Sequence, residues 1–87
     1  MKADKERIVL CFGEVIRMAR LKKHLSQQDV GEMIGVSHVH IGHMERGKRE
    51  PSITMALRLC EALEVNINDV IKSIIEELEE INKAPQP

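Results

Sequence analysis

LSQQDVGEMIGVSHVHIGHMERG, residues 25–47, contains the signals for two short helices and for a tight turn between them. Ser26 and Ser37 each precede a helical run, where a serine hydroxyl can accept the free N–H groups of the first turn. Asp29 follows Ser26 by three positions, as in a capping box. Gly35 and Gly47 follow the two runs and can adopt the left-handed conformation that ends a helix. The sequence therefore predicts a helix-turn-helix over residues 26–46.

The second of these helices is predicted to have a buried side and an exposed side. At 100° per residue, Ile41 and Met44 fall on one side, while Val39, His43 and Arg46 fall on the other. A valine in a polar exposed face suits a major-groove surface, because valine can touch a thymine methyl group and histidine can bond to base edges or phosphates. The alternative is an ordinary solvated helix face that carries one valine.

With these residues the chain resembles the Cro and phage-repressor (Xre-type) family of helix-turn-helix regulators over about residues 12–71. The resemblance is carried by a set of short elements along the chain: Ile16-Arg17 with Arg20, Leu25-Ser26-Gln27, Gly35-Val36-Ser37, Ile41 with Glu45-Arg46-Gly47, Pro51-Ser52, Leu57 to Leu63, and Val65-Asn66. It implies an all-α fold, a five-helix λ-repressor-like DNA-binding domain, here with an extended C-terminal helix.

The resemblance also implies roles for individual residues in binding double-stranded DNA. It implies an ion pair between Arg20 and Glu45 that ties the first helix to the end of the recognition helix. The predicted contacts to bases come from His38, Val39, Gly42 and His43, and the predicted contacts to phosphates come from Gln27, Ser37, His40, Arg46, Lys48 and Arg49.

Two positions depart from the family pattern without removing a predicted DNA contact. His24 stands where the family favours glycine, so it must adopt a positive φ or reshape the turn. Gly31 replaces the usual alanine in the second helix, which costs about 0.5 to 1 kcal/mol of helix stability. Histidines at 38, 40 and 43 are also less familiar on this face, and they predict that DNA affinity rises as the pH falls.

Length and composition favour one small helical domain. The 87 residues include a single aromatic, Phe12, so the core must be built from aliphatic side chains and methionine. We expect one domain over residues 1–83, with helices over about 5–23, 53–63 and 67–82, and a disordered tail over 84–87. The helix at 53–63 is expected to bury Ile53, Ala56, Leu57, Leu59, Cys60 and Leu63; the first helix has its inner stripe at Ile8, Phe12, Val15, Ile16 and Ala19.

The net charge of −1 is unevenly distributed. Residues 1–51 have a net charge of +3 and residues 52–87 a net charge of −4. A local basic patch matters more for phosphate contact than the overall charge. This distribution predicts moderate, salt-sensitive affinity for DNA.

The sequence gives little support for a disulfide-bonded, secreted, membrane, metal-binding or enzymatic protein. Cys11 and Cys60 lie in apolar stripes and are interpreted as reduced thiols, with a disulfide as the alternative. No secretory leader and no membrane-spanning run is present, so we expect a cytoplasmic protein without membrane contact. Histidines two apart on a helix diverge, which argues against a metal site. No cofactor is expected, and the absence of a catalytic constellation argues against an enzyme.

The last predicted helix has a longer apolar stripe than a small domain needs. We expect a homodimer interface at Ile74, Ile75, Leu78 and Ile81, with Asn66 and Asp69 forming a second capping box at the start of the helix. The alternative is that the end of this helix folds back on the first helix at Ile8 and Val9. The leading functional hypothesis is a transcriptional regulator, of the repressor type, that binds a near-palindromic operator as a dimer. The alternative is an antitoxin or other protein-interaction module that holds a partner protein such as a toxin with this helix.

Overall fold

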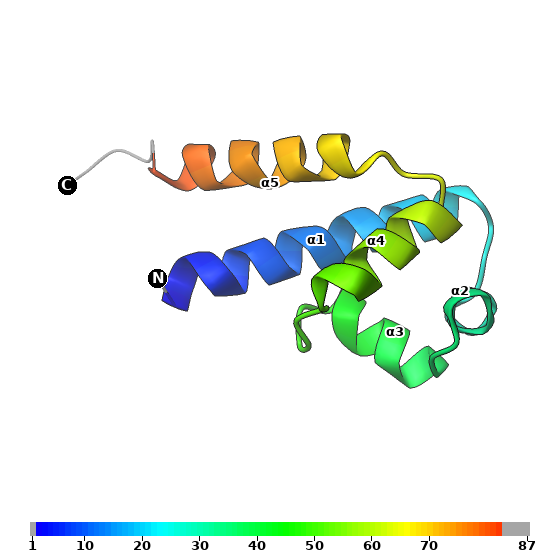
Figure 1. Ribbon diagram of the computed structural model, residues 1–87. Helices are drawn as coiled ribbons and strands as arrows, with labels where there is room; N and C mark the ends of the chain where they lie inside the picture. The colour runs from blue at the N-terminus through cyan, green and yellow to red at the C-terminus, as the bar shows by residue number, and fades with distance from the viewer. Residues whose placement is uncertain (1, 83–87) are drawn as a thin grey trace.

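The computed structural model describes residues 2–82, and the side chains of residues 4–80 within them (Figure 1). The described part is all-α and contains no strand, as predicted. Its elements are α1 (Lys2–Lys22), α2 (Gln27–Ile34), α3 (His38–Glu45), α4 (Ile53–Ala62) and α5 (Ile67–Asn82). The expected tail at 84–87 and the side chain of Ile81 lie outside the described residues.

Serine caps begin the three central helices. The Ser26 Oγ accepts the Asp29 N–H at 2.9 Å, and the Ser26 N–H donates to Asp29 Oδ2 at 2.8 Å, which completes the predicted capping box. Ser37 and Ser52 cap α3 and α4 in the same way, accepting from the third residue on. Each cap contributes about 1 kcal/mol. The start of α5 differs from the prediction, because Asn66 Oδ1 accepts the Asn68 N–H at 2.8 Å in place of a capping box with Asp69.

The capping box makes helix stability depend on pH. Hydrogen bonds from the Ser26 backbone and side chain lower the pKa of Asp29 below its ordinary value of 3.8. Because the folded-state pKa is the lower one, the contribution is present above pH 4 or so and is lost as the pH falls through the folded value. We expect Asp29→Asn to destabilise the protein at pH ~6 by more than at pH ~2. Chemical denaturation at the two pH values measures the difference, and an equal loss at both would contradict it.

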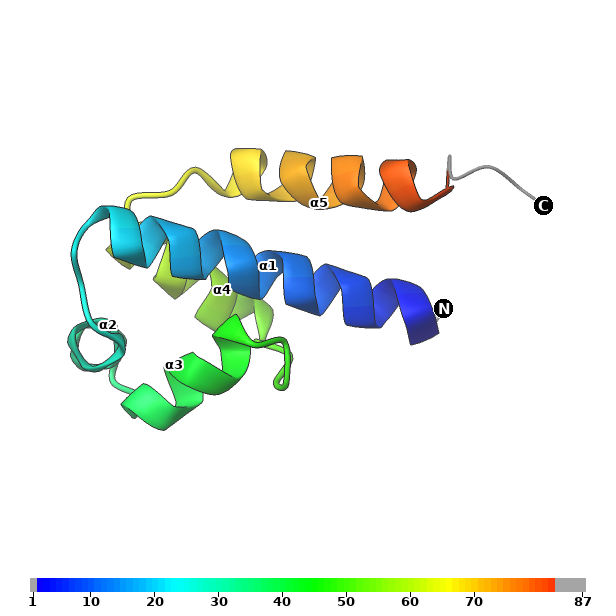
Figure 2. The ribbon, with the colours of Figure 1, turned by 180° about the vertical axis from the view of Figure 1, so that it is seen from behind.

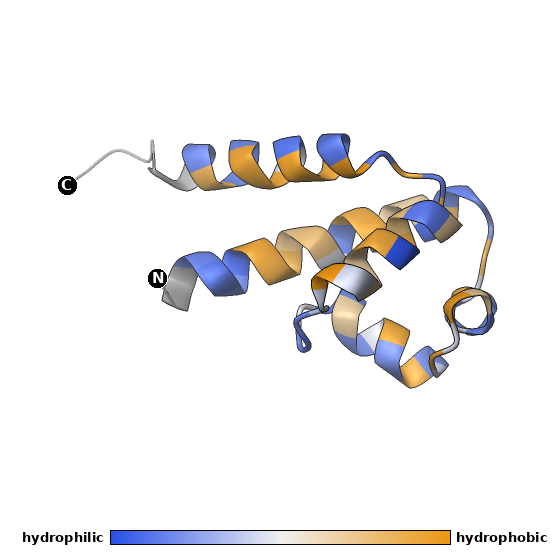
Figure 3. Ribbon diagram, viewed as in Figure 1, coloured by the Kyte–Doolittle hydropathy of each residue, from blue (hydrophilic) through white to orange (hydrophobic). Residues whose placement is uncertain are grey.

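The core lies between α1 and the other four helices and is aliphatic apart from Phe12. Its fully or nearly buried members are Phe12, Ile16, Val30, Ile34, Ile41, Met44, Leu59, Cys60, Leu63 and Val70. Helix α5 runs antiparallel to α1 and lies alongside it in both views (Figures 1 and 2). The apolar side of α5 faces α1 and its charged side faces outward (Figure 3).

Three residues that the sequence analysis placed in the core are exposed. Val9, and not Ile8, is buried on α1, because the inner stripe of α1 is turned toward α3. On α4, Ile53 is 79% exposed and Leu57 is 48% exposed. The prediction for Ile53 and Leu57 was wrong because the apolar side chains of α4 span a wide arc of the helix. The neighbouring helices of the same chain cover only part of that arc.

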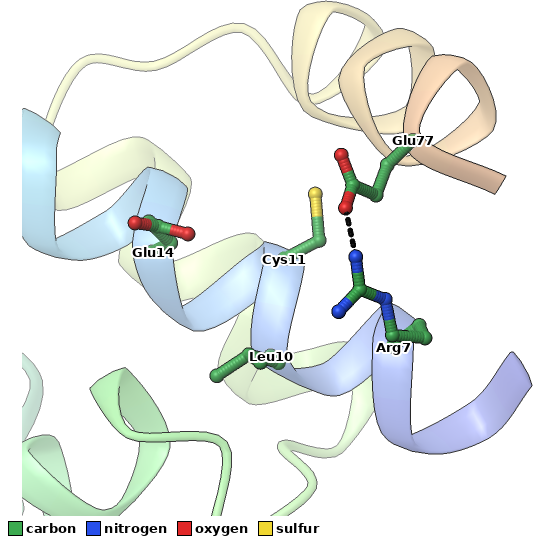
Figure 4. Close-up of a pocket in the computed structure, with 5 residues that line it drawn as sticks. All are labelled: Arg7, Leu10, Cys11, Glu14 and Glu77. Carbon is green, nitrogen blue, oxygen red and sulfur yellow. Dashed lines mark hydrogen bonds and ion pairs between the residues drawn. The ribbon is translucent and has the colours of Figure 1, made fainter. Parts of the chain in front are cut away.

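The predicted interface stripe on α5 is divided between the core and the surface. Ile74 packs against the core and Leu78 is half-buried, while Ile75 is 49% exposed. An ion pair between Arg7 and Glu77 further ties α1 to α5 (Figure 4). Part of α5 therefore folds back on α1, as in the alternative prediction, while the side chain of Ile75 faces solvent.

Both cysteines are free thiols in this fold. Cys60 is buried in the core, and Cys11 lies half-buried between α1 and α5 beside Arg7 and Glu77 (Figure 4). Burial raises the pKa of both thiols, and the carboxylates of Glu77 and Glu14 raise that of Cys11 further. A raised pKa disfavours the reactive thiolate, so both residues act as small apolar side chains.

Candidate nucleic-acid interface

Helix α3 presents one side to the core and one side to solvent. Ile41 and Met44 are at most 1% exposed, whereas Val39 is 51% exposed. His38 and Arg46 are also exposed, and His40 and His43 are half-buried. The side with Val39 therefore offers polar groups and one apolar group with no packing role inside the chain.

Gly42 was predicted to contact bases from this surface, but it is buried and does not belong to the exposed side of α3. A Cβ atom at this position would lie 3.1 Å from Arg46 Nη1 and 3.3 Å from Gln27 Oε1. These two side chains cover the glycine, so it can offer neither a side chain nor open backbone to a base. Its small size allows the Gln27 amide to lie against α3.

Gln27 is held in place by the acidic end of α3. Its Nε2 donates to Glu45 Oε1 at 3.1 Å, which leaves one amide N–H and the Oε1 available to other partners. The residue is the first of α2, where unpaired backbone N–H groups also attract anions. The neighbouring cap residue Ser37 accepts the His40 N–H with its Oγ and keeps its own hydroxyl proton to donate.

Arg20 and Glu45 form the ion pair that the resemblance implied. Arg20 Nε donates to Glu45 Oε2 at 2.6 Å, and Nη2 donates to Oε1 at 3.0 Å. Arg20 Nη1 also donates to the Leu25 carbonyl at 2.8 Å. The side chains are 10% and 2% exposed, and the hydrogen bond to Glu45 raises the pKa of Arg20. Through these bonds the buried pair connects α1, the residue Leu25 before α2, and the end of α3.

The loop after α3 carries cations that point to solvent. Gly47 has φ 69°, and the Lys48 N–H donates to the His43 carbonyl at 2.9 Å, so the loop turns tightly back on α3. Arg46, Lys48 and Arg49 are exposed, and no ion pair found among residues 4–80 includes them. Their charges are therefore free to meet an anionic partner beside the exposed side of α3.

The turn before α2 shows how the chain accommodates His24. The residue has φ 58°, so it adopts the positive φ that the family's glycine would supply. Gly31, which was expected only to weaken α2, is buried, and a Cβ there would lie 2.4 Å from the Val36 carbonyl oxygen. The α2–α3 turn passes too close to Gly31 for a larger residue without a shift of the backbone.

Gly13, which was not predicted to have a functional role, sets the distance between α1 and α3. A Cβ at Gly13 would lie 2.2 Å from the Met44 carbonyl oxygen and 2.8 Å from that of Glu45. The signal in the sequence was a lone glycine inside a strong helical pattern, which often marks a close backbone approach. Gly13 brings α1 close enough for Arg20 to reach Glu45.

Comparison with known proteins identifies the family. The family model described as Helix-turn-helix matches residues 16–70, which include α2, α3 and α4 and the Arg20–Glu45 pair. The chain belongs to the Xre-type helix-turn-helix family. Members of this family are DNA-binding transcriptional regulators, and the fold described above is that of their DNA-binding domain.

Individual relatives of this helix-turn-helix domain include regulators from phage and bacteria. Repressor protein C2 of Salmonella phage P22 is 38% identical over 61 residues, which are 70% of this chain and 28% of that protein. An uncharacterized HTH-type transcriptional regulator of Rickettsia prowazekii is 37% identical over 76 residues, 87% of this chain and 55% of that protein. The chain thus spans between about a quarter and about half of the length of these two relatives.

The fold of the helix-turn-helix domain is also seen in a crystal structure. The clp gene regulator ClgR from Corynebacterium glutamicum superposes with a TM-score of 0.77 at 22% sequence identity, over 87% of this chain and 82% of that one. At this identity the likeness shows the fold alone.

Within residues 2–82, no helix is both long enough and apolar enough to cross a membrane. The same part of the chain holds no group of three or more side chains that could bind a metal ion together.

Proposed function

We propose that this chain represses transcription by binding a near-palindromic operator as a homodimer, with α3 of each copy in the major groove. The observation that carries the proposal is the exposed side of α3, where Val39 is 51% exposed while Ile41 and Met44 on the opposite side are buried. The free cations of the following loop lie beside this side and match the charge of the DNA backbone. A DNA-binding regulator of bacterial or phage type would act in the cytoplasm.

We assign base contacts to three of the residues on α3. His38 and Val39 are exposed and near the start of the helix, which is the part of a recognition helix that contacts base edges. His43 lies one turn further along and is half-buried, so it has a more defined orientation. Gly42 keeps a role in this scheme only by allowing Gln27 to approach α3.

We assign phosphate contacts to groups on both sides of α3. Gln27, Ser37 and His40 lie toward the α2–α3 turn, and Arg46, Lys48 and Arg49 lie toward the following loop. Such contacts fix the position of α3 on the duplex without reading its sequence. In a twofold dimer, Ile75 and Leu78 would make part of the contact, with Ile74 and Ile81 beside them. Such a dimer would place the two copies of α3 about 34 Å apart on one face of the DNA.

The test compares one proposed base contact with one proposed phosphate contact. We expect His43→Ala to change the preference at one or two base pairs, because a base-edge contact is worth about 1 to 3 kcal/mol of discrimination. Arg49→Ala should weaken all sites alike and lower the slope of log affinity against log salt by about one. Binding of both variants to a panel of single-base operator variants at several salt concentrations measures both effects.

The two variants serve as controls for each other, because both remove a side chain from the same end of the helix-turn-helix. A uniform loss over all sequences for His43→Ala would reject its role in base reading. A sequence-dependent loss for Arg49→Ala, with the salt slope unchanged, would reject the role of Arg49 as a phosphate contact.

A further inference from the structure

Arg46 continues the exposed side of α3 beyond the last residue of the helix. Its backbone N–H still donates to the Gly42 carbonyl at 3.1 Å, so the helical path extends through this residue. At 100° per residue, Arg46 lies about 20° to one side of Val39, and His43 lies about 40° to the other side. The three side chains therefore leave α3 along one stripe.

The other two cations of this region leave the helical path. Gly47 has φ 69°, which turns the chain away from the direction of α3. Lys48 and Arg49 follow this turn, so their side chains start from the loop. Cations on such a loop are placed for the phosphates that border a groove, whereas a residue on the exposed side of a recognition helix is placed for base edges.

The side chain of Arg46 folds back over the preceding turn of α3. Its Nη1 lies 3.1 Å from the place that a Cβ atom would take at Gly42. Because Gly42 has no side chain, the guanidinium lies close to the helix surface, one turn before its own Cα. Arg46 is exposed, and its side chain takes part in no hydrogen bond or ion pair found among residues 4–80. Its N–H donors are therefore available to a partner.

The Gln27 amide limits where this guanidinium can lie. The Gln27 Oε1 is 3.3 Å from the same Cβ position at Gly42, and the Nε2 donates to Glu45 Oε1 at 3.1 Å. The bond to Glu45 fixes the amide, with its carbonyl oxygen over Gly42 beside the guanidinium. A carbonyl oxygen attracts a guanidinium, so the Arg46 side chain gives up part of its freedom before it meets DNA. Such preorganisation lowers the entropic cost of binding.

A guanidinium held in this way matches guanine. It is planar and presents two parallel N–H donors. In the major groove, guanine presents two neighbouring acceptors, O6 and N7, while each of the other three bases presents a donor or a methyl group in place of one of them. The side chain of Arg46 can therefore distinguish a G·C pair from the other pairs.

We propose that Arg46 reads one guanine in each half-site of the operator, in addition to the attraction of its charge for nearby phosphates. The proposal deepens the proposed function and rests on it, since it requires α3 to lie in the major groove. Arg46 is then a residue that determines specificity. Gly42 and Gln27 are positioning residues, because they leave the room over α3 and restrict the guanidinium within it.

The first test replaces each G·C pair of the selected operator by A·T in both half-sites. We expect the unmodified chain to lose affinity about 5- to 150-fold at the pair that Arg46 reads. Arg46→Ala should bind the two DNAs within about 2-fold of each other. The matched control is Arg49→Ala, which removes the same side chain from the loop and should keep the full preference for G·C. A preference that survives in Arg46→Ala at every G·C pair, or that Arg49→Ala removes to the same extent, would overturn the proposal.

The second test removes one acceptor from the DNA. In 7-deazaguanine a C–H group replaces N7, while the Watson–Crick edge is unchanged. Placed at each guanine of the operator in turn, it should weaken binding of the unmodified chain about 5-fold or more at one position in each half-site. Arg46→Ala should show no such loss at that position, because the donor is already absent. An unmodified chain that responds at no guanine would overturn the proposal.

Gly42→Ala tests the positioning roles. The added methyl would meet Arg46 Nη1 and Gln27 Oε1, which are the ends of flexible side chains, so the fold should persist. Alanine is also the better helix former, and the melting temperature should not fall. We expect the G·C preference to fall about 3-fold or more, because base contacts tolerate displacements of only about 0.5 Å. A folded Gly42→Ala variant with the full preference would overturn the positioning role of Gly42.

The outcomes separate this proposal from the proposed function. A chain that selects an operator without a G·C pair in its half-sites, or with guanines that tolerate 7-deazaguanine, would keep the proposed function and overturn the role of Arg46. A chain that selects no sequence from a random library would overturn the proposed function, and the role of Arg46 with it. Thermal melts followed by circular dichroism show that each variant is folded.

Discussion

Glu45→Ala is expected to lower the free energy of unfolding by about 3 to 5 kcal/mol, because it leaves a buried guanidinium without its carboxylate. Arg20 is 10% exposed in its side chain and makes two of its three hydrogen bonds to Glu45. The variant also removes the acceptor of the Gln27 amide. Urea denaturation at neutral pH measures the loss.

Two control variants show whether the loss of stability comes from leaving a buried charge unpaired or from removing an ion pair of any kind. Lys23→Ala removes an exposed ion pair with Glu64, which should cost less than about 1 kcal/mol. The double variant Arg20→Met/Glu45→Leu should be more stable than Glu45→Ala, because neither charge is left unpaired. A Glu45→Ala loss no larger than that of Lys23→Ala would show that the buried pair is unimportant for stability.

Gly13→Ala is expected to lower the free energy of unfolding by about 3 kcal/mol, although alanine is the better helix former by about 1 kcal/mol. The added methyl would lie 2.2 Å from the Met44 carbonyl oxygen, and a backbone atom cannot move aside without shifting α3. Since α3 is the proposed recognition helix, DNA binding should weaken as well. Thermal and urea denaturation measure the first effect, and operator titration measures the second.

Gly35→Ala provides the matched control for Gly13→Ala. Gly35 has φ 78° and a Cβ there would meet no atom within 4 Å, so only the backbone conformation is penalised. The expected loss is about 1 to 2 kcal/mol. If Gly13→Ala stabilised the protein, as its helix propensity alone would predict, the close contact between α1 and α3 would be refuted.

The elements of this fold could be predicted because their boundaries depend on local chemistry. Ser26, Ser37 and Ser52 accept hydrogen bonds from the first turns of their helices, and Gly35 and Gly47 adopt positive φ. Such signals act over a few residues and are therefore visible in the sequence. The resemblance to the family added the Arg20–Glu45 pair, which joins residues 25 positions apart.

What the sequence concealed depends on the neighbours in space. A helical count gives the direction of Gly42 but not the reach of Gln27 and Arg46, which cover it. The same count could not show that α1 touches α3 at Gly13. It also could not show which helix covers each part of the wide apolar arc of α4, so Ile53 was placed in the core although it is 79% exposed.

The most direct test of the account is selection of bound sequences from a random duplex library at about 50 mM salt, where phosphate contacts are strong. The 87-residue chain and its His38→Ala/His43→Ala variant are compared in parallel. We expect the unmodified chain to enrich two inverted half-sites whose centres are about 10 base pairs apart, and the variant to lose preference at the same positions in both half-sites. No enrichment over random DNA, or an identical enriched sequence for the variant, would contradict the claim that the exposed side of α3 reads DNA.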